Sequence, residues 1–333
     1  MGRPCATLLL ADAGGDVESL GAQLEAALRE AVVLVAADRA NLLAGEDSPL
    51  PTTPRSESAA KIVLAAETLG LTYRDSAGSL RWTERVRTEA SDAQQRQKLC
   101  AMLPLYATYI TLAATGDETS APPKTQLSTD PHAYRCFLEA VHVSNLEHAA
   151  WVAALPAFAA AKTLVDVGGG YGTFALAWVG SSPERDAVVV DLPGVAELSP
   201  EHPRIRRISA DLLEGCELPP GGDVYFFANV LHLLTNWRDV LGEARSAARQ
   251  SGAMLAVYEA RPDGSAGTWF DLQIHLRSGR VTSLLDPREI EEALDAATGG
   301  ESARFSYSAP GDPLRREFQL TVSTIEVIDD GAA

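Results

Sequence analysis

The sequence contains few of the residues that mark several large protein classes. Only four of its 333 residues are cysteines, far apart and without a C-x-x-C pair: Cys5, Cys100, Cys136 and Cys216. This pattern excludes a disulfide-rich secreted scaffold and predicts reduced thiols. No run approaches the roughly 20 apolar residues of a membrane span, and the start of the chain lacks the apolar core of a signal peptide. We therefore expect a cytoplasmic protein without a membrane partner.

Basic residues are also scarce. The chain has 28 Lys and Arg against 45 Asp and Glu, a net charge of −17, which repels nucleic acid and anionic surfaces. The balance leaves small-molecule chemistry open. A hydrophobic fraction of 46% is enough to bury a substantial core. The length suits two domains, and we expect them at residues 1–115 and 162–333, joined by a helical linker and pocket wall at 116–161.

The N-terminal part shows helical periodicity over Leu20–Leu43 and again over Ser56–Leu69, where Gly70 ends the helix. Two short runs, 71–74 and 80–83, then flank a turn and predict a β-hairpin. A helix followed by a hairpin has the outline of a winged helix. The acidic charge favours a dimerisation or lid module over a DNA-binding regulator, because Arg81, Arg85 and Arg87 barely provide a basic face.

From Lys162 onward, short apolar runs alternate with helical segments. The predicted strands are Thr163–Val167, Ala187–Asp191, Ile205–Ser209, Asp223–Phe227, Ala253–Glu259, Arg304–Ser308 and Glu317–Ile325. The predicted helices are Thr173–Val179, Asn236–Gln250 and Asp286–Ala297. Continuous apolar strands suit a parallel sheet covered on both faces, whereas the last strand alternates. We expect an α/β, Rossmann-like, doubly wound sheet of seven strands that ends in an antiparallel hairpin.

The glycine-rich run Leu164-Val-Asp-Val-Gly-Gly-Gly-Tyr-Gly172 joins the first of these strands to a helix. Glycines let the backbone approach a ligand closely, and the amides at the start of the helix face it. Dinucleotide-binding proteins use a related turn. Here Asp166 lies within the motif, where it would oppose a pyrophosphate but suit an ammonium group or ordered water, so we disfavour a nicotinamide oxidoreductase.

Two further carboxylates follow the next two strands. Asp191 ends the second strand, where a carboxylate can accept hydrogen bonds from ribose hydroxyls. Asp211 comes just after the third and suits an exocyclic amine of adenine. Three acids after three successive strands of one sheet favour a nucleoside-binding site over unrelated surface residues.

The order of these motifs, followed by Gly222-Asp-Val-Tyr-Phe-Phe-Ala-Asn-Val-Leu-His232, resembles the plant and bacterial small-molecule O-methyltransferases. The resemblance covers Phe137–Val327 well and Ser56–Thr83 only faintly, as the winged-helix dimerisation domain of such enzymes. It implies a homodimer that binds S-adenosyl-L-methionine and methylates a hydroxyl of a small, aromatic natural-product-type acceptor.

Residue by residue, the resemblance places His232 at the family's catalytic base and Glu259 at the acid that orients it. Imidazole suits the task, because a hydroxyl is a poor nucleophile until it is deprotonated. The positions that the resemblance assigns to the cofactor are Asp166, Gly168, Gly170, Asp191, Leu192, Asp211, Leu212 and Asn229; those assigned to the acceptor are His142, Trp269, Asp271 and His275.

The chain departs from the family at three places. Leu233-Leu234 replaces the Asp-Trp pair after the histidine, Ala228 replaces a lysine, and Gly279-Arg-Val-Thr282 lacks the family's second catalytic acid. An arrangement of one histidine with two acids is therefore not expected. Base catalysis by His232 with Glu259 alone remains reasonable.

Two alternatives stay open. His275 lies where metal-dependent C-methyltransferases of 2-oxo acids, which share the fold, place a metal ligand. Together with His232, and with His142 nearby, His275 would bind iron or zinc. The metal would then acidify the carbon of a 2-oxo acid or aromatic acceptor that is to be methylated. Alternatively, the fold binds the cofactor but catalyses a reaction without methyl transfer.

Overall fold

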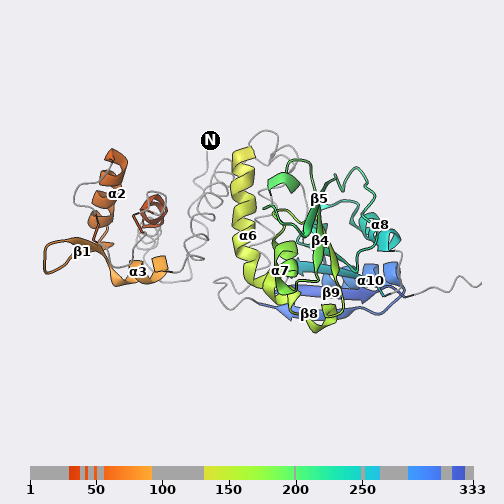
Figure 1. The fold of residues 1–333 in the computed structure, drawn as a ribbon. Coiled ribbons are helices and arrows are strands. Elements are labelled where there is room, and N and C mark those ends of the chain that lie inside the picture. Colours follow the sequence, from red (N-terminus) through yellow and green to blue (C-terminus); the bar gives the residue numbers. More distant parts are fainter. Residues whose placement is uncertain are drawn as a thin grey trace, which may run out of the picture. The chain divides into compact units, whose positions relative to one another are not determined.

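The computed structural model describes residues 30–37, 42–43, 49–50, 56–91, 131–198, 200–248, 252–262, 284–308 and 317–326. The chain forms two compact units, Met1–Leu103 and Pro104–Ala333. Figure 1 shows a small helical unit with one hairpin and a larger unit built on a sheet. Among the described residues, no helix is both long and apolar enough to cross a membrane.

The first unit contains the two helices that its periodicity predicts. Helix α2 (Glu57–Thr68) is capped by Ser56, whose hydroxyl accepts a hydrogen bond from the Ala59 amide at 3.1 Å. The earlier helix, predicted over Leu20–Leu43, is seen over residues 30–37. The Leu42 amide donates to the Ala37 carbonyl at 2.8 Å, and Leu42 and Leu43 are not helical, whereas the predicted start of this helix lies outside the described residues.

The predicted hairpin is also present. Strands β1 (Thr72–Arg74) and β2 (Leu80–Trp82) pair antiparallel, and helix α3 (Glu84–Ser91) follows. The helices and the hairpin of this unit enclose a small hydrophobic core. Its buried members are Val33, Ala37, Leu50, Ala66, Leu71, Leu80, Trp82 and Val86.

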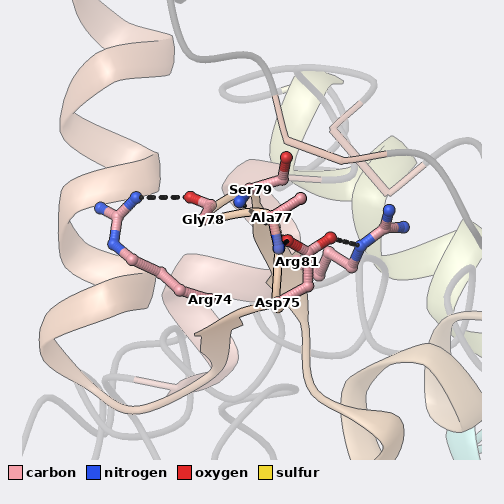
Figure 2. A network of polar contacts seen from close by, with 6 residues as sticks. All are labelled: Arg74, Asp75, Ala77, Gly78, Ser79 and Arg81. Atoms are coloured by element: carbon pink, nitrogen blue, oxygen red, sulfur yellow. Dashed lines mark hydrogen bonds and ion pairs between the residues drawn. The ribbon is translucent and has the colours of Figure 1, made fainter.

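Asp75 organises the turn of this hairpin (Figure 2). Its Oδ1 accepts from the amides of Ala77 at 3.0 Å and Ser79 at 2.9 Å, and its Oδ2 accepts from Arg81 Nε at 2.6 Å. The hydrogen bond from Arg81, with those from the two amides, holds the pKa of Asp75 below its ordinary value. The carboxylate therefore fixes the turn most strongly in its ionised form.

The second unit is built on a seven-stranded sheet in the order β5-β4-β3-β6-β7-β9-β8. Strands β3 to β7 are parallel, whereas β9 is antiparallel to both β7 and β8. The strands are β3 (Thr163–Val167), β4 (Asp186–Asp191), β5 (Ile205–Ser209), β6 (Val224–Ala228), β7 (Met254–Ala260), β8 (Ala303–Tyr307) and β9 (Phe318–Thr324). The strand order reverses between β3 and β6.

Helices cover both faces of the sheet. Helices α6 (Pro131–Ala153) and α7 (Thr173–Ser181) pack on one face with residues such as Phe226. Helices α8 (Trp237–Ala248) and α10 (Pro287–Thr298) pack on the other with residues such as Phe227. Single-turn 3-10 helices lie at Pro156–Phe158 (η1), Ala196–Leu198 (η2) and Leu231–Leu233 (η3). The result is a three-layer α/β unit.

A buried arginine ties the helices of the first face together. Arg185 donates from Nη1 to the Ala153 carbonyl at 2.8 Å and from Nη2 to the Phe158 carbonyl at 2.7 Å. Its guanidinium lies over the Trp178 ring, 3.9 Å from the centroid. One planar fork thus satisfies carbonyls of α6 and η1 while it packs on α7.

All seven predicted strands and the three predicted helices between them are confirmed, within one or two residues at each end. The last strand differs in its surroundings. Phe318, Leu320 and Val322 share one face as predicted, but α10 covers the other face, so the polar residues between them are buried too. A hydrogen bond of 2.7 Å between the Ser323 and Thr298 hydroxyls satisfies part of that face.

Candidate functional site

The predicted site residues gather at the carboxyl edge of the sheet, around the point where the strand order reverses. In open parallel sheets this is the crevice where ligands bind. The glycine turn follows β3, Asp191 ends β4, Asn229 and His232 follow β6, and Glu259 lies near the end of β7.

The glycine turn depends on its lack of side chains. Gly168, Gly170 and Gly172 have φ of 69°, 56° and 77°, a left-handed conformation that favours glycine. A Cβ on Gly168 would overlap the side chain of Val230. The turn therefore contacts the segment after β6, which brings the predicted cofactor site and His232 into one place.

Asp191 is fixed by two backbone amides. Its Oδ2 accepts from the Gly170 amide at 2.6 Å and its Oδ1 from the Leu192 amide at 2.7 Å. Burial raises its pKa to about 6, although both amides favour the charged form. Each oxygen keeps a lone pair that can accept from a ligand hydroxyl.

Asp166 lies beneath the glycine turn. A Cβ on Gly169 would stand 2.7 Å from the Asp166 carboxyl carbon, so the carboxyl group supports the turn from below. Oδ2 accepts from the Ala175 amide of α7 at 3.3 Å, and Oδ1 is buried without a hydrogen-bond partner. Burial raises the pKa of Asp166 to about 7, with a smaller contribution from the charge of Asp191.

His232 and Glu259 form a buried pair. His232 Nδ1 lies 2.7 Å from Glu259 Oε2, and both side chains are only 3% exposed. The second carboxylate oxygen accepts from the Leu231 amide at 3.0 Å. Because an ionised carboxylate only accepts, Nδ1 bears the ring hydrogen, which leaves Nε2 as a proton acceptor.

Asn229 forms the corner between β6 and this pair. It is the one non-glycine residue with positive φ (52°) in the described part of the chain. Its amide donates to the Tyr258 carbonyl at 2.8 Å, while its side-chain Oδ1 is buried and unpartnered. The corner directs Leu231 and His232 onto Glu259.

Two neighbouring residues predicted to bind the cofactor, Asp211 and Leu212, differ in the placement of their side chains. Asp211 follows β5, and the preceding amide, Ala210, donates to the Asp191 carbonyl at 2.8 Å, so the two strand ends are adjacent. Asp211 Oδ1 accepts from the Leu213 amide at 3.1 Å. The Leu212 side chain is buried in the core with residues of α8, and its carbonyl accepts from Asn236 Nδ2 at 2.9 Å.

His142 lies against the glycine turn. Its Nδ1 is 2.9 Å from the Thr173 hydroxyl, and its ring packs on Tyr171 with centroids 4.5 Å apart. Burial lowers the pKa of His142. Tyr171 was not predicted as a site residue. Its position between Gly170 and Gly172 is the sequence signal that could have identified it. It joins a cluster that covers the turn: Tyr134, Phe137, Leu138, Leu192, Val195 and Leu198.

Three predicted acceptor residues, Trp269, Asp271 and His275, and the loop Gly279–Thr282 lie outside the described residues. Within the described ranges, no group of three or more His, Cys, Asp or Glu side chains could hold a metal ion. The metal site that His275 would share thus stays a prediction.

Known proteins resemble this chain in sequence. A phenazine O-methyltransferase from Lysobacter antibioticus is 30% identical over 56% of this chain and 56% of its own length. A norreticuline-7-O-methyltransferase from Papaver somniferum is 30% identical over 45% and 43%. The chain thus aligns with about half the length of these curated relatives.

Solved structures show the fold. A mitomycin 7-O-methyltransferase superposes with a TM-score of 0.66 at 19% identity, over 92% of this chain and 97% of the other. Human N-acetylserotonin methyltransferase, solved with S-adenosylmethionine, gives 0.65 at 16% identity, over 96% and 100%. The family described as O-methyltransferase domain matches residues 121–292, more than half of the chain. The chain therefore belongs to the O-methyltransferase domain family.

Proposed function

We propose that this protein transfers a methyl group from S-adenosyl-L-methionine to a hydroxyl of a small, aromatic, natural-product-type acceptor. The observation that carries the proposal is the buried His232–Glu259 pair, which lies beside a glycine turn with a fixed carboxylate at Asp191. The family of the chain supports methyl transfer to oxygen.

The described residues fit the cofactor. A Cβ on Gly168 or Gly169 would overlap Val230 or Asp166, so glycine is needed for the path of this turn, and without side chains its backbone can approach a ligand closely. Asp191, held by two amides, keeps lone pairs for the ribose hydroxyls, and Asp166 offers an uncompensated buried carboxyl to a cation. When bound, S-adenosyl-L-methionine supplies an electrophilic methyl group on a positively charged sulfur.

His232 is the proposed general base. Glu259 accepts from Nδ1 and holds the ring in one orientation, so that Nε2 takes the proton of the acceptor hydroxyl. The Leu231 amide fixes the carboxylate in turn. The contact between Val230 and Gly168 keeps the base close to the glycine turn, so that proximity of the two reactants contributes further to the rate.

The acceptor class is proposed from the relatives. Those named above methylate a phenazine and norreticuline, and a further one, from Streptomyces cremeus, is a 3-amino-4-hydroxybenzoate 4-O-methyltransferase, 32% identical over 30% of this chain. All three names describe methyl transfer to oxygen, and the last names a hydroxybenzoate as the acceptor. We also propose that the enzyme works as a homodimer in the cytoplasm.

The test is an assay of methyl transfer from S-adenosyl-L-methionine labelled in its methyl group to a panel of phenols and 2-oxo acids. The proposal expects label on a phenolic oxygen together with release of S-adenosylhomocysteine. Label on carbon that disappears with a chelator would indicate the metal-dependent alternative. Cofactor binding without release of S-adenosylhomocysteine would indicate a reaction without methyl transfer.

A further inference from the structure

Asp166 is a buried carboxyl group with too few hydrogen bonds to stabilise its negative charge. It is fully buried, its one hydrogen-bond donor is the Ala175 amide at the long distance of 3.3 Å, and Oδ1 has no partner. A buried carboxylate is costly unless it is paired and hydrogen-bonded. Asp191, on the adjacent strand, is bonded to the same turn and adds like charge.

A cation on the glycine turn would remove this deficit. The carboxyl lies directly under Gly169, between Gly168 and Gly170, where the resemblance to the small-molecule O-methyltransferases implies the methionine end of the cofactor. S-adenosyl-L-methionine carries a sulfonium and an ammonium against one carboxylate, so its net charge is +1. After methyl transfer the sulfur is a neutral thioether, and the net charge of S-adenosylhomocysteine is zero.

We propose, on the basis of the proposed function, that Asp166 is a buried counter-charge that favours the cationic cofactor over its neutral product, and that binding of the cation is coupled to loss of a proton from this carboxyl. Asp166 thus determines specificity without touching the acceptor. The proton passes to solvent, and no other bond is made or broken.

Few other charged groups face Asp166. Asp191 is on β4; α7 presents the Ala175 amide and Thr173, whose hydroxyl is paired with His142 of α6; and β6, Val224–Ala228, contains no charged residue. Burial lowers the pKa of His142, which keeps it neutral near pH 7. The pKa of about 7 for Asp166 leaves roughly half of the unliganded molecules protonated at that pH.

The experiment is calorimetric titration of the full chain with S-adenosyl-L-methionine and with S-adenosylhomocysteine, at pH 7 in two buffers of different ionisation enthalpy. The cation should release up to roughly half a proton more than the thioether. The ratio of the two affinities should rise by up to about tenfold between pH 6 and pH 8. Both ligands share the ribose, so protonation of Asp191 cancels in the comparison.

Asp166→Asn identifies the group that loses the proton, because it removes the charge and leaves the ligand's own amino group unchanged. This variant should lose the excess proton release and the pH dependence of the affinity ratio. Asp186→Asn, which changes an exposed carboxylate at the other end of β4, should keep both. Should Asp166→Asn not fold, the wild-type comparison across pH decides alone.

Equal proton release by the two ligands, or a ratio that stays constant with pH, would overturn the inference and leave the proposed function standing. Failure of both ligands to bind would overturn the proposed function itself.

Discussion

At the scale of single residues, the proposed chemistry depends on one imidazole held by one carboxylate. His232→Ala should reduce kcat by about 10²- to 10⁴-fold, because it removes the proposed general base for the acceptor hydroxyl. The dissociation constant of S-adenosyl-L-methionine should change little, since the proposed cofactor contacts, apart from Asn229, lie at the ends of β3, β4 and β5. Turnover and calorimetric binding, measured on the same preparation, check both statements.

Glu259→Gln serves as the companion variant. It keeps the shape of the side chain but weakens the hydrogen bond to Nδ1, so kcat should fall less than in His232→Ala. Undiminished turnover in His232→Ala would show that proximity of the reactants suffices without a base.

Substitutions of Asn229 can separate the effect of its backbone conformation on stability from the effect of its side chain. Its φ of 52° is tolerated by glycine and asparagine but costs other residues about 1–2 kcal/mol. Asn229→Ala should therefore destabilise the protein by about that amount in urea unfolding, while Asn229→Gly should be nearly neutral. If the two variants unfold at the same urea concentration, the left-handed corner is not what selects the residue.

The same residues show what could be predicted from sequence. Asp191 and His232 follow apolar strands whose ends are easy to locate, and parallel strands bring their carboxyl ends to one edge. The position of Asp166 under the turn could not be predicted, because it depends on which way the last residues of β3 face. The pairing of His142 with Thr173 joins two helices, and no spacing along the chain encodes it.

At the scale of elements, the hairpin of the first unit depends on the ionised form of Asp75. Its pKa lies below its ordinary value of 3.8, mainly through Arg81. The carboxylate therefore stabilises the turn at pH values above 3.8, and this contribution is lost as the pH falls through the lowered pKa. Amide chemical shifts of Ala77 and Ser79 should move in that acidic range, and in Asp75→Asn they should lack the transition.

Glu57→Gln is a suitable control for this titration. It removes an exposed ion pair with Lys61 on α2, which contributes little to stability. A transition of the hairpin amides that persists in Asp75→Asn would assign the effect to another group.

In the second unit, Arg185 should matter more than its single charge suggests. Arg185→Met leaves the buried Ala153 carbonyl without this donor and the Phe158 carbonyl with the Ala161 amide at 3.2 Å, at a cost of about 1–3 kcal/mol in unfolding free energy. Arg238 provides a matched comparison, since it also lies over a tryptophan ring, 4.1 Å from the centroid, but is exposed. Arg238→Met should cost no more than about 0.5 kcal/mol; similar losses in both variants would argue against the carbonyl contacts.

At the scale of the whole molecule, composition limits the possible partners more than it identifies them. The net charge of −17 opposes duplex binding whatever the outline of the first unit. What the first unit does present is apolar surface. Of the four large hydrophobic side chains exposed within the described ranges, Val32, Leu64 and Tyr73 belong to it, and only Leu213 belongs to the second unit.

Exposed apolar side chains in one unit are the kind of surface that a second copy would cover. We therefore predict that the protein sediments as a dimer and that Leu64→Glu, at a position that is 64% exposed, shifts it toward the monomer. Because the side chain is exposed, the charge should cost the fold itself little, and the melting temperature of the monomer provides that check. Leu213→Glu, which introduces the same charge on the second unit, should leave the dimer intact. If the unaltered protein sediments as a monomer at micromolar concentration, the apolar side chains of the first unit are exposed in solution. That result would contradict their assignment to a dimer interface.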